Sequence, residues 1–428
     1  MTTVTIAASL QPPSAPIAAG RPAWVEGSLA SLMLYLPLLA TTLLAKLSVP
    51  PFAAQSLSIA YLFIFLAIGL GLAIGCLRLD SRRLSFFLLL IGGIGALQVL
   101  RGEPFSVNSL LLLGTLHLGY VFYLERGSES TARALAFFVD LATVLALLGI
   151  AQYALQSVLG ARYVFPIENL VPPDFVVRGF NMQAPIAQGL ETYRANGVFL
   201  AEPSFFSQFM AIAIIVELLT SNRLHRVALY GLALLLSYSG TGLLLLAVCG
   251  PLILLGRRHW GLLWLALGGL ALAVALGGYL ELDRLIARLG EFGSMRSSGF
   301  ARFLSGFHVF DQYLWPYPDK ALFGYGAGQF PLYAVRMPFP VAEMTLFKMI
   351  FEYGLVGAAL YFSFIAYCLF RSAAPAIICL AVGLSLLLNG PYVPFFHGLA
   401  LSLLVWTAPP PASEARPLTQ RAFRADGA

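Results

Sequence analysis

Charged residues are scarce in this chain of 428 residues. Asp, Glu, Lys and Arg together make up 11% of it, whereas they make up roughly 25% of a soluble globular protein. Cysteine is scarce as well, and the four cysteines stand apart from one another with no C-x-x-C spacing. Neither a disulfide framework nor a cysteine-based metal site is therefore expected. No repeat of fixed period is found, so a transporter built from internal repeats gains no support.

Apolar residues are abundant instead. The hydrophobic fraction is 59% and the mean hydropathy is +0.82. Runs of about 20 apolar residues cross a membrane as helices. The sequence therefore predicts an all-α, polytopic membrane helix bundle with about 12 transmembrane helices. The expected spans are 28–46, 56–77, 84–100, 106–124, 132–158, 204–221, 225–238, 240–256, 260–280, 346–370, 374–389 and 393–408. The seventh and eighth are short, and they can also be interpreted as one broken hairpin or as partly re-entrant segments.

Arginines indicate how the bundle is oriented, because positive residues concentrate in cytoplasmic connections. Arg21 precedes the first expected span. The connections expected in the cytoplasm carry Arg78, Arg82, Arg83, Arg126, Arg133, Arg223, Arg226, Arg257, Arg258 and Arg371. The short connections on the other side carry only Lys46 and Arg101. Both termini are therefore expected in the cytoplasm. The net charge of +6 is largely this signal, and no basic stripe or RNA-binding motif points to nucleic acid.

Two long loops break the pattern of short connections, and both are expected outside the cytoplasm. The predicted organisation is a cytoplasmic tail (1–27), helices 1–5 (28–158), a first loop (159–203), helices 6–9 (204–280), a larger second loop (281–345), helices 10–12 (346–408) and a cytoplasmic tail (409–428). The first 27 residues lack the positively charged start of a cleavable signal peptide. Both loops are rich in aromatic residues and arginines, so we expect them to fold as caps on the bundle.

The stretch RANGVFLAEPSFFSQFMA, residues 194–211, places two charges just before a long apolar run. Proline is favoured at the first position of a helix, so Pro203 predicts the start of the sixth span. Glu202 is then at the helix N-terminus, where the helix dipole favours an anion. Arg194 is close enough in sequence to fold back onto the same helix N-terminus. A purely structural role is the alternative, with Glu202 capping the helix and Arg194 pairing with it or with lipid headgroups.

Two more charged clusters follow in the second half of the chain. Arg302 and His308 lie on a short amphipathic stretch of the second loop. Glu343, Lys348 and Glu352 lie where the chain re-enters the membrane. Ionisable groups inside a bilayer suggest function, although pairing within the bundle or at the membrane edge explains them equally well.

The glycine-rich stretch FGYGAGQF, residues 323–330, resembles a phosphate-binding loop only superficially. It lacks the Walker lysine and the following Ser or Thr, and no strand–loop–helix frame surrounds it. We expect a tight turn, in which Gly324, Gly326 and Gly328 supply unusual backbone angles.

Taken in order, these segments resemble the superfamily of O-antigen ligases and Wzy-type polysaccharide polymerases. The segment R-x-x-G-x-f-x-E-P-s is matched by Arg194, Gly197, Phe199, Glu202, Pro203 and Ser204. The segment S-x-S-x-T-G is matched by Ser237, Ser239, Thr241 and Gly242, and the loop arginine by Arg302. The segment l-f-G-x-G-x-g-x-f is matched by residues 322–330, and E-x-G-l-i-G by Glu352, Gly354, Leu355, Val356 and Gly357. The similarity covers roughly residues 190–360.

The resemblance implies a GT-C-like bundle in the bacterial inner membrane with its active site facing the periplasm. It implies glycosyl transfer from an undecaprenyl-diphosphate-linked oligosaccharide that is both donor and acceptor, with no nucleotide sugar, metal or other cofactor. A flippase and a chain-length regulator of the same pathway are the implied partners. Arg194, Arg302 and Arg336 are then the candidates for binding the diphosphate, because arginine holds phosphate bidentately. Ser239 and Thr241 are also carried over as substrate-binding residues. Glu202, Glu343 and His308 are the candidates for catalytic acid–base groups.

One departure favours a polymerase over a ligase. Many ligases carry a histidine at the start of the span that ends in E-x-G, and this chain has Glu343 at that position. The alternatives are an O-antigen ligase or a protein O-oligosaccharyltransferase. A flippase for the same lipid-linked glycan is a third possibility, but the charges gather in two loops instead of spreading along many spans.

Overall fold

The protein is described by a computed structural model that covers residues 23–50, 57–125, 127–187, 189–257, 294–295 and 297–409. Within these ranges the chain is mostly helical, which confirms the all-α part of the predicted fold class. The strands of the described part are two three-residue segments, β1 (Leu77–Leu79) and β2 (Phe122–Leu124), which pair antiparallel. Three of the described helices are long and apolar enough to cross a membrane: α3 (Ser81–Arg101), α5 (Gly127–Leu159) and α17 (Thr345–Phe370).

Shorter apolar helices make up the rest of the bundle. They are α1 (Ala23–Leu43), α2 (Ala60–Ile74), α4 (Val107–His117), α8 (Pro203–Leu219), α9 (Leu224–Leu236), α10 (Gly240–Arg257), α18 (Ala376–Leu387) and α19 (Pro394–Ala400), the last continued by a π-helix at Leu401–Val405. Eleven of the twelve predicted spans each overlap one of these described helices. The ninth predicted span, 260–280, lies outside the described residues. The seventh and eighth are α9 and α10, two separate helices joined by the turn 237–239.

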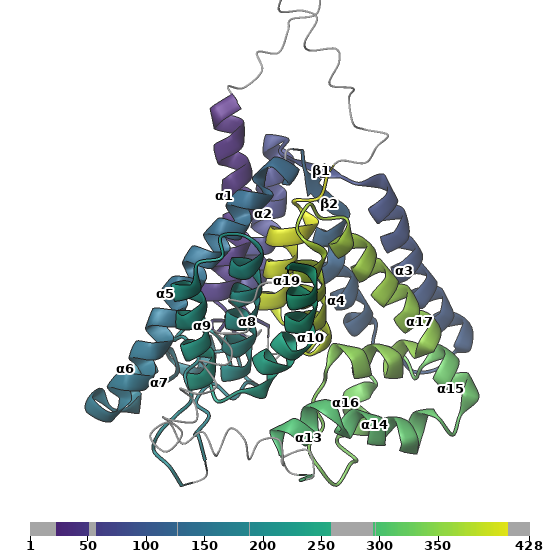
Figure 1. Ribbon diagram of the computed structural model, residues 1–428. Coiled ribbons are helices and arrows are strands. Elements are labelled where there is room, and N and C mark those ends of the chain that lie inside the picture. The colour runs from purple at the N-terminus through teal and green to yellow at the C-terminus, as the bar shows by residue number, and fades with distance from the viewer. Residues whose placement is uncertain are drawn as a thin grey trace, which may run out of the picture.

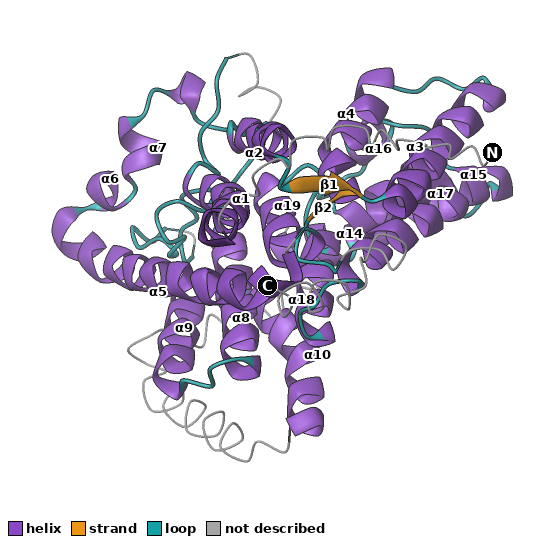
Figure 2. Ribbon diagram, turned by 90° about the horizontal axis from the view of Figure 1, so that it is seen from above, coloured by secondary structure: helices purple, strands orange, loops and turns teal. Residues whose placement is uncertain are grey.

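Helix α8 is the centre of one half of the bundle. All of its residues from Pro203 to Leu219 are buried, as expected for a helix that is hydrophobic on every side. It packs against α9 and α10, and also against α5 and α18. Figure 2 shows α9, α8 and α10 side by side below α5. The N-terminus of α8, where the charged motif lies, is therefore surrounded by other helices.

The two long loops lie at the same end of the bundle. In Figure 1 the strands are at the top, whereas the short helices of both loops are at the bottom. The first loop contains α6 (Ala161–Val164), α7 (Pro166–Leu170) and the 3-10 turn Pro173–Phe175. The second contains α13 (Ser298–Phe303), α14 (Ser305–Val309), a π-helix at Phe310–Leu314, α15 (Pro318–Phe323) and α16 (Phe330–Ala334). The described parts of both loops are thus folded.

Buried charged residues join the helices at the opposite end of the bundle. Asp80 caps α3, and its Oδ2 atom accepts a hydrogen bond of 3.0 Å from Nη1 of Arg371. Arg83 is fully buried, and its Nη1 atom donates to the carbonyl oxygens of Phe122 and Val405, each at 2.9 Å. Buried charges need such partners. Arg83 and Arg371, which the sequence marks as orientation signals, therefore also join α3 to β2, α17 and the C-terminal π-helix.

The glycine-rich stretch docks against a kink in α17. Gly354 has a φ of 67° inside that helix. The kink leaves backbone acceptors for the loop: the amide of Tyr325 donates to the Phe351 carbonyl at 2.9 Å, and the amide of Gly326 to the Glu352 carbonyl at 2.8 Å. The φ angles of Gly324, Gly326 and Gly328 are 78°, 107° and 77°, as predicted for a tight turn. The glycine-rich stretch and the start of α17 are therefore joined through backbone hydrogen bonds.

Candidate functional site

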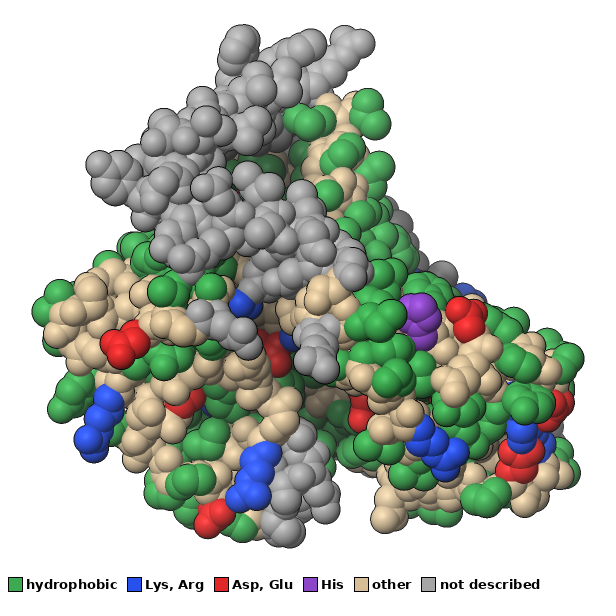
Figure 3. Space-filling model, turned by 90° about the horizontal axis from the view of Figure 1, so that it is seen from below, with side chains coloured by type: hydrophobic (Ala, Val, Ile, Leu, Met, Phe, Trp, Pro, Cys, Tyr) green, Lys and Arg blue, Asp and Glu red, His purple; other side chains and the backbone are tan. Residues whose placement is uncertain are grey.

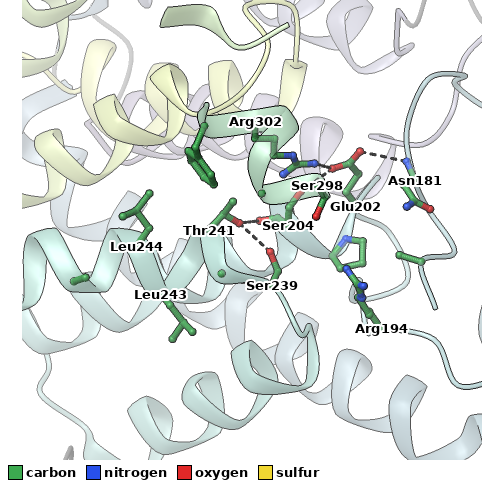
Figure 4. Close-up of a pocket in the computed structure, with 16 residues that line it drawn as sticks. Asn181, Arg194, Glu202, Ser204, Ser239, Thr241, Leu243, Leu244, Ser298 and Arg302 are labelled. Atoms are coloured by element: carbon green, nitrogen blue, oxygen red, sulfur yellow. Dashed lines mark hydrogen bonds and ion pairs between the residues drawn. The ribbon is translucent and has the colours of Figure 1, made fainter. Parts of the chain in front are cut away.

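A cavity of about 560 Å³ opens at the end of the bundle that carries the two long loops. It lies between the first loop, the N-terminus of α8, the start of α10 and helix α13 (Figure 4). Five of the eight candidate site residues line it: Arg194, Glu202, Ser239, Thr241 and Arg302. Three segments that are distant in sequence (181–204, 239–247 and 298–303) therefore meet at one site.

Glu202 occupies the N-cap position of α8, and Pro203 is the first helical residue, as predicted. The carboxylate of Glu202 does not bond the first backbone amides of the helix, however. Its backbone is extended, with φ −139° and ψ 153°. The side chain instead accepts a hydrogen bond of 2.7 Å from the hydroxyl of Ser204. The structure therefore contradicts the alternative in which Glu202 caps the helix through its side chain, and the carboxylate faces the cavity.

The partner of Glu202 in the cavity is Arg302. Nη2 of Arg302 pairs with Oε2 of Glu202, and the backbone amide of Asn181 donates to Oε1 of Glu202 at 3.2 Å. With the bond from the Ser204 hydroxyl, the carboxylate of Glu202 thus accepts three hydrogen bonds. Arg302 is in the last turn of α13, a helix that Ser297 caps through the Phe300 amide at 3.0 Å. The Arg302 side chain is 24% exposed, so part of its guanidinium faces the cavity.

Arg194 enters the cavity from the first loop. Its backbone amide donates to the Ala184 carbonyl at 2.9 Å, and its Nη2 atom to the Ile186 carbonyl at 3.4 Å. The following amide, that of Ala195, donates to the Leu236 carbonyl at the end of α9 at 3.1 Å. The backbone of Arg194 is therefore tied to its own loop on one side and to a helix on the other.

A buried polar network holds the residues that follow Arg194, and the sequence reasoning did not identify it. Asn196 is its centre: the amide group donates to the Met182 carbonyl at 2.8 Å and to Oε1 of Glu168 at 3.2 Å. Its backbone amide donates to Oε1 of Gln152 at 2.9 Å. Lys46 is fully buried and pairs with Glu168. A lysine on the side that positive residues avoid was the signal that could have pointed to this network.

The second wall of the cavity consists of hydroxyl groups where α10 crosses α8. The Thr241 hydroxyl donates to the Ser204 carbonyl at 3.1 Å, and the Ser239 hydroxyl lies 3.1 Å from that of Thr241. A Cβ atom on Gly242 would lie 2.3 Å from the Ser207 carbonyl oxygen, so the two helices touch there. Because the Thr241 proton goes to Ser204, the bond between the two hydroxyls is donated by Ser239, and each oxygen keeps only lone pairs for a ligand.

The far end of the cavity is apolar. Leu243, Leu244 and Ala247 of α10 and Phe303 of α13 line it. Leu243 and Leu244 also remain 36% and 39% exposed, and Val248 one turn further is 42% exposed. The cavity thus joins a charged, hydroxyl-rich end to an apolar end that continues along the exposed face of α10.

The other three predicted site residues do not line the cavity. Glu343 pairs with Lys348, whose Nζ atom lies 2.9 Å from Oε2 of Glu343. His308 is exposed on α14, where its ring stacks on Phe300 with centroids 5.5 Å apart. Arg336 is exposed, and its guanidinium lies 4.7 Å from the centre of the Tyr333 ring. Figure 3 views this end of the molecule, where charged side chains, some of them next to a side chain of opposite charge, are scattered among hydrophobic ones.

No group of three or more His, Cys, Asp or Glu side chains suited to a metal ion is found in the described ranges. No model of a known protein family matches the sequence, and no curated protein matches it. The function is therefore inferred from the cavity and from the sequence motifs.

Proposed function

We propose that this protein is a Wzy-type polymerase, which joins undecaprenyl-diphosphate-linked oligosaccharide repeats into a bacterial polysaccharide. The observation that carries the proposal is the two-ended cavity. Arg194, Arg302 and the Ser239 hydroxyl lie at one end, and Leu243 and Leu244 lie at the other. A diphosphate linked to an isoprenoid has the same division into an anionic and an apolar part. Arginine suits the first, because it keeps its charge and binds phosphate through two parallel hydrogen bonds.

The proposed reaction is a glycosyl transfer. A sugar hydroxyl of the acceptor repeat forms a bond to the anomeric carbon of the donor, whose bond to the diphosphate breaks. The electron pair of that bond stays on the diphosphate, so negative charge develops there, and an oxygen of the departing diphosphate takes the proton of the hydroxyl. Fixed positive charges close to the departing group stabilise such a transition state by several kcal/mol. Arg194 and Arg302 are assigned this role.

Glu202 is assigned the role of positioning Arg302. Its two oxygens accept hydrogen bonds from Arg302, from the Ser204 hydroxyl and from the backbone amide of Asn181. Three of the roughly four acceptor positions of the carboxylate are therefore occupied within the protein. A carboxylate that fixes the arginine favours the geometry required for the leaving group, since preorganised charges need not reorient during the reaction.

The proposed topology has twelve transmembrane spans, both termini in the cytoplasm and the cavity at the periplasmic face of the inner membrane. It rests on the distribution of arginines in the sequence and on the eleven apolar helices. The two long loops at one end of the bundle (Figure 1) then form the periplasmic surface.

Deletion of the gene tests the proposal directly, with the lipid-linked glycans of the cells as the readout. Loss of a polymerase leaves single repeats on the carrier and on any acceptor. Loss of a ligase instead leaves long polymer on the carrier and none on lipid A core, and loss of a flippase leaves repeats on the cytoplasmic face. Unchanged polymer length after deletion contradicts the proposal. Restoration of polymer by the wild-type gene is the control.

A further inference from the structure

Asn181 lines the cavity but is not part of any motif that the sequence revealed. Its backbone is held firmly. The backbone amide of Asn181 donates to Oε1 of Glu202 at 3.2 Å. On one side, the ring of Phe180 packs edge-on against Phe205 of α8 with centroids 5.7 Å apart. On the other side, the Met182 carbonyl accepts the hydrogen bond of the Asn196 network. Three consecutive residues are therefore anchored, which fixes where the Asn181 side chain begins.

The carboxamide of Asn181 is exposed at the cavity, and it forms no hydrogen bond within the described part of the chain. Figure 4 draws it beside Glu202 and across from Arg302. A carboxamide offers two donors and one acceptor but no charge. A phosphate presents only acceptors and is better held by the arginines. A sugar ring, in contrast, presents hydroxyls that both donate and accept, which is the pattern that a carboxamide matches.

We infer that Asn181 binds hydroxyl groups of the sugar next to the diphosphate and contributes to the choice of that sugar. The position follows from Glu202, which bonds both the Asn181 amide and Arg302. A ligand that places its diphosphate on Arg302 brings its first sugar within reach of Asn181. This inference rests on the proposed function, since it requires a carrier-linked glycan as the ligand.

The experiment compares two ligands on the purified full-length protein. One is undecaprenyl diphosphate, which has no sugar. The other is the carrier-linked repeat extracted from cells in which the gene is deleted. The variant Asn181→Ala keeps the backbone amide and hence its bond to Glu202. We expect it to weaken binding of the glycosylated carrier by about 3- to 10-fold, the value of one neutral hydrogen bond, and to leave the Kd of undecaprenyl diphosphate unchanged.

Two controls frame the result. Asn108→Ala removes an exposed amide at the start of α4, outside the cavity lining, and should change neither Kd. Arg302→Ala should weaken both ligands. Equal weakening of both ligands by Asn181→Ala overturns the inference, because Asn181 then acts on the diphosphate. Wild-type affinity for both ligands overturns it as well. If the wild-type protein binds neither ligand, the proposed function itself fails.

Discussion

Glu202 and Arg302 are one hundred residues apart in the chain and form an ion pair at the rim of the cavity. One comes from the N-terminus of α8 and the other from α13 in the second long loop. The pair therefore ties that loop to α8, a helix that is buried at every residue. The side chain of Glu202 is 11% exposed and that of Arg302 24% exposed, so the arginine is the partner that remains accessible to a ligand.

The first prediction concerns the arginines. Arg302→Ala and Arg194→Ala should each lower the polymerisation rate by about 10²- to 10³-fold, because each removes a fixed charge from the leaving group. Polymer length and yield in a complemented deletion strain provide the measurement, with protein amounts compared by immunoblot. Arg336→Ala is the matched control, since Arg336 lies outside the cavity. Full activity of both cavity variants, at normal protein levels, would show that the site is elsewhere.

The second prediction separates the two roles open to Glu202. Glu202→Gln keeps a hydrogen-bond acceptor for Arg302 but removes the charge. If Glu202 positions Arg302, this variant should lose about 10-fold in rate, whereas Glu202→Ala should lose more, and both should keep the shape of the wild-type pH–rate profile. A general base predicts the opposite: the acidic limb of the profile disappears in Glu202→Gln. The measurement is the initial rate of polymer formation between pH 4 and 9 in reconstituted membranes.

The third prediction concerns the buried pair of Lys46 and Glu168, whose side chains are 0% and 7% exposed. Lys46→Met leaves Glu168 buried without its cation, which should cost about 3–5 kcal/mol of stability. The double variant Lys46→Met/Glu168→Gln should be more stable than Lys46→Met alone, because the unpaired charge is gone. Thermal unfolding in detergent, followed by tryptophan fluorescence, gives the comparison. A double variant that is the less stable of the two contradicts this account.

The fourth prediction tests the orientation of the bundle by cysteine labelling. Of the four native cysteines, three are buried and Cys76 is partly exposed, so the background variant is Cys76→Ala. Tyr163→Cys and Val335→Cys, at positions 65% and 81% exposed in the two long loops, should react with a membrane-impermeant maleimide added to spheroplasts. Glu125→Cys at the opposite end should react only after the membrane is opened. Labelling with the reverse pattern would place the cavity in the cytoplasm.

The sequence predicted the helical class and the start of α8, because both depend on local properties. Long apolar runs have few alternatives to helices in a membrane, and a proline after Glu202 marks a helix start in any context. Arg194, Glu202 and Arg302 were likewise identified, because charges stand out in a chain that has so few. The pairing of Glu202 with Arg302 could not be predicted from the sequence, since it depends on how α13 docks on α8.

The sequence was weakest where a residue acts through packing. In the sequence, the charged or titratable residues Glu343, His308 and Arg336 were as plausible as Glu202 and Arg302. All three lie outside the cavity, where Glu343 pairs with Lys348, His308 stacks on Phe300 and Arg336 lies over Tyr333. Asn196 and Gln152 were missed for the opposite reason. Neutral amides carry no signal in the sequence, and their role depends on bonds to backbone groups that are far away in the chain.

The last prediction concerns Gly242, where α10 touches α8. In Gly242→Ala the new methyl group would lie 2.3 Å from the Ser207 carbonyl oxygen, and relief of that overlap requires the helices to separate. We expect a loss of about 1–3 kcal/mol in stability. We also expect reduced activity, because Ser239 and Thr241 move away from Arg194 and Arg302 on the other side of the cavity. Gly250→Ala is the control on the same helix, since a Cβ atom there meets nothing within 4 Å. If both variants unfold at the wild-type temperature and polymerise normally, the close crossing of α8 and α10 is not what shapes the cavity.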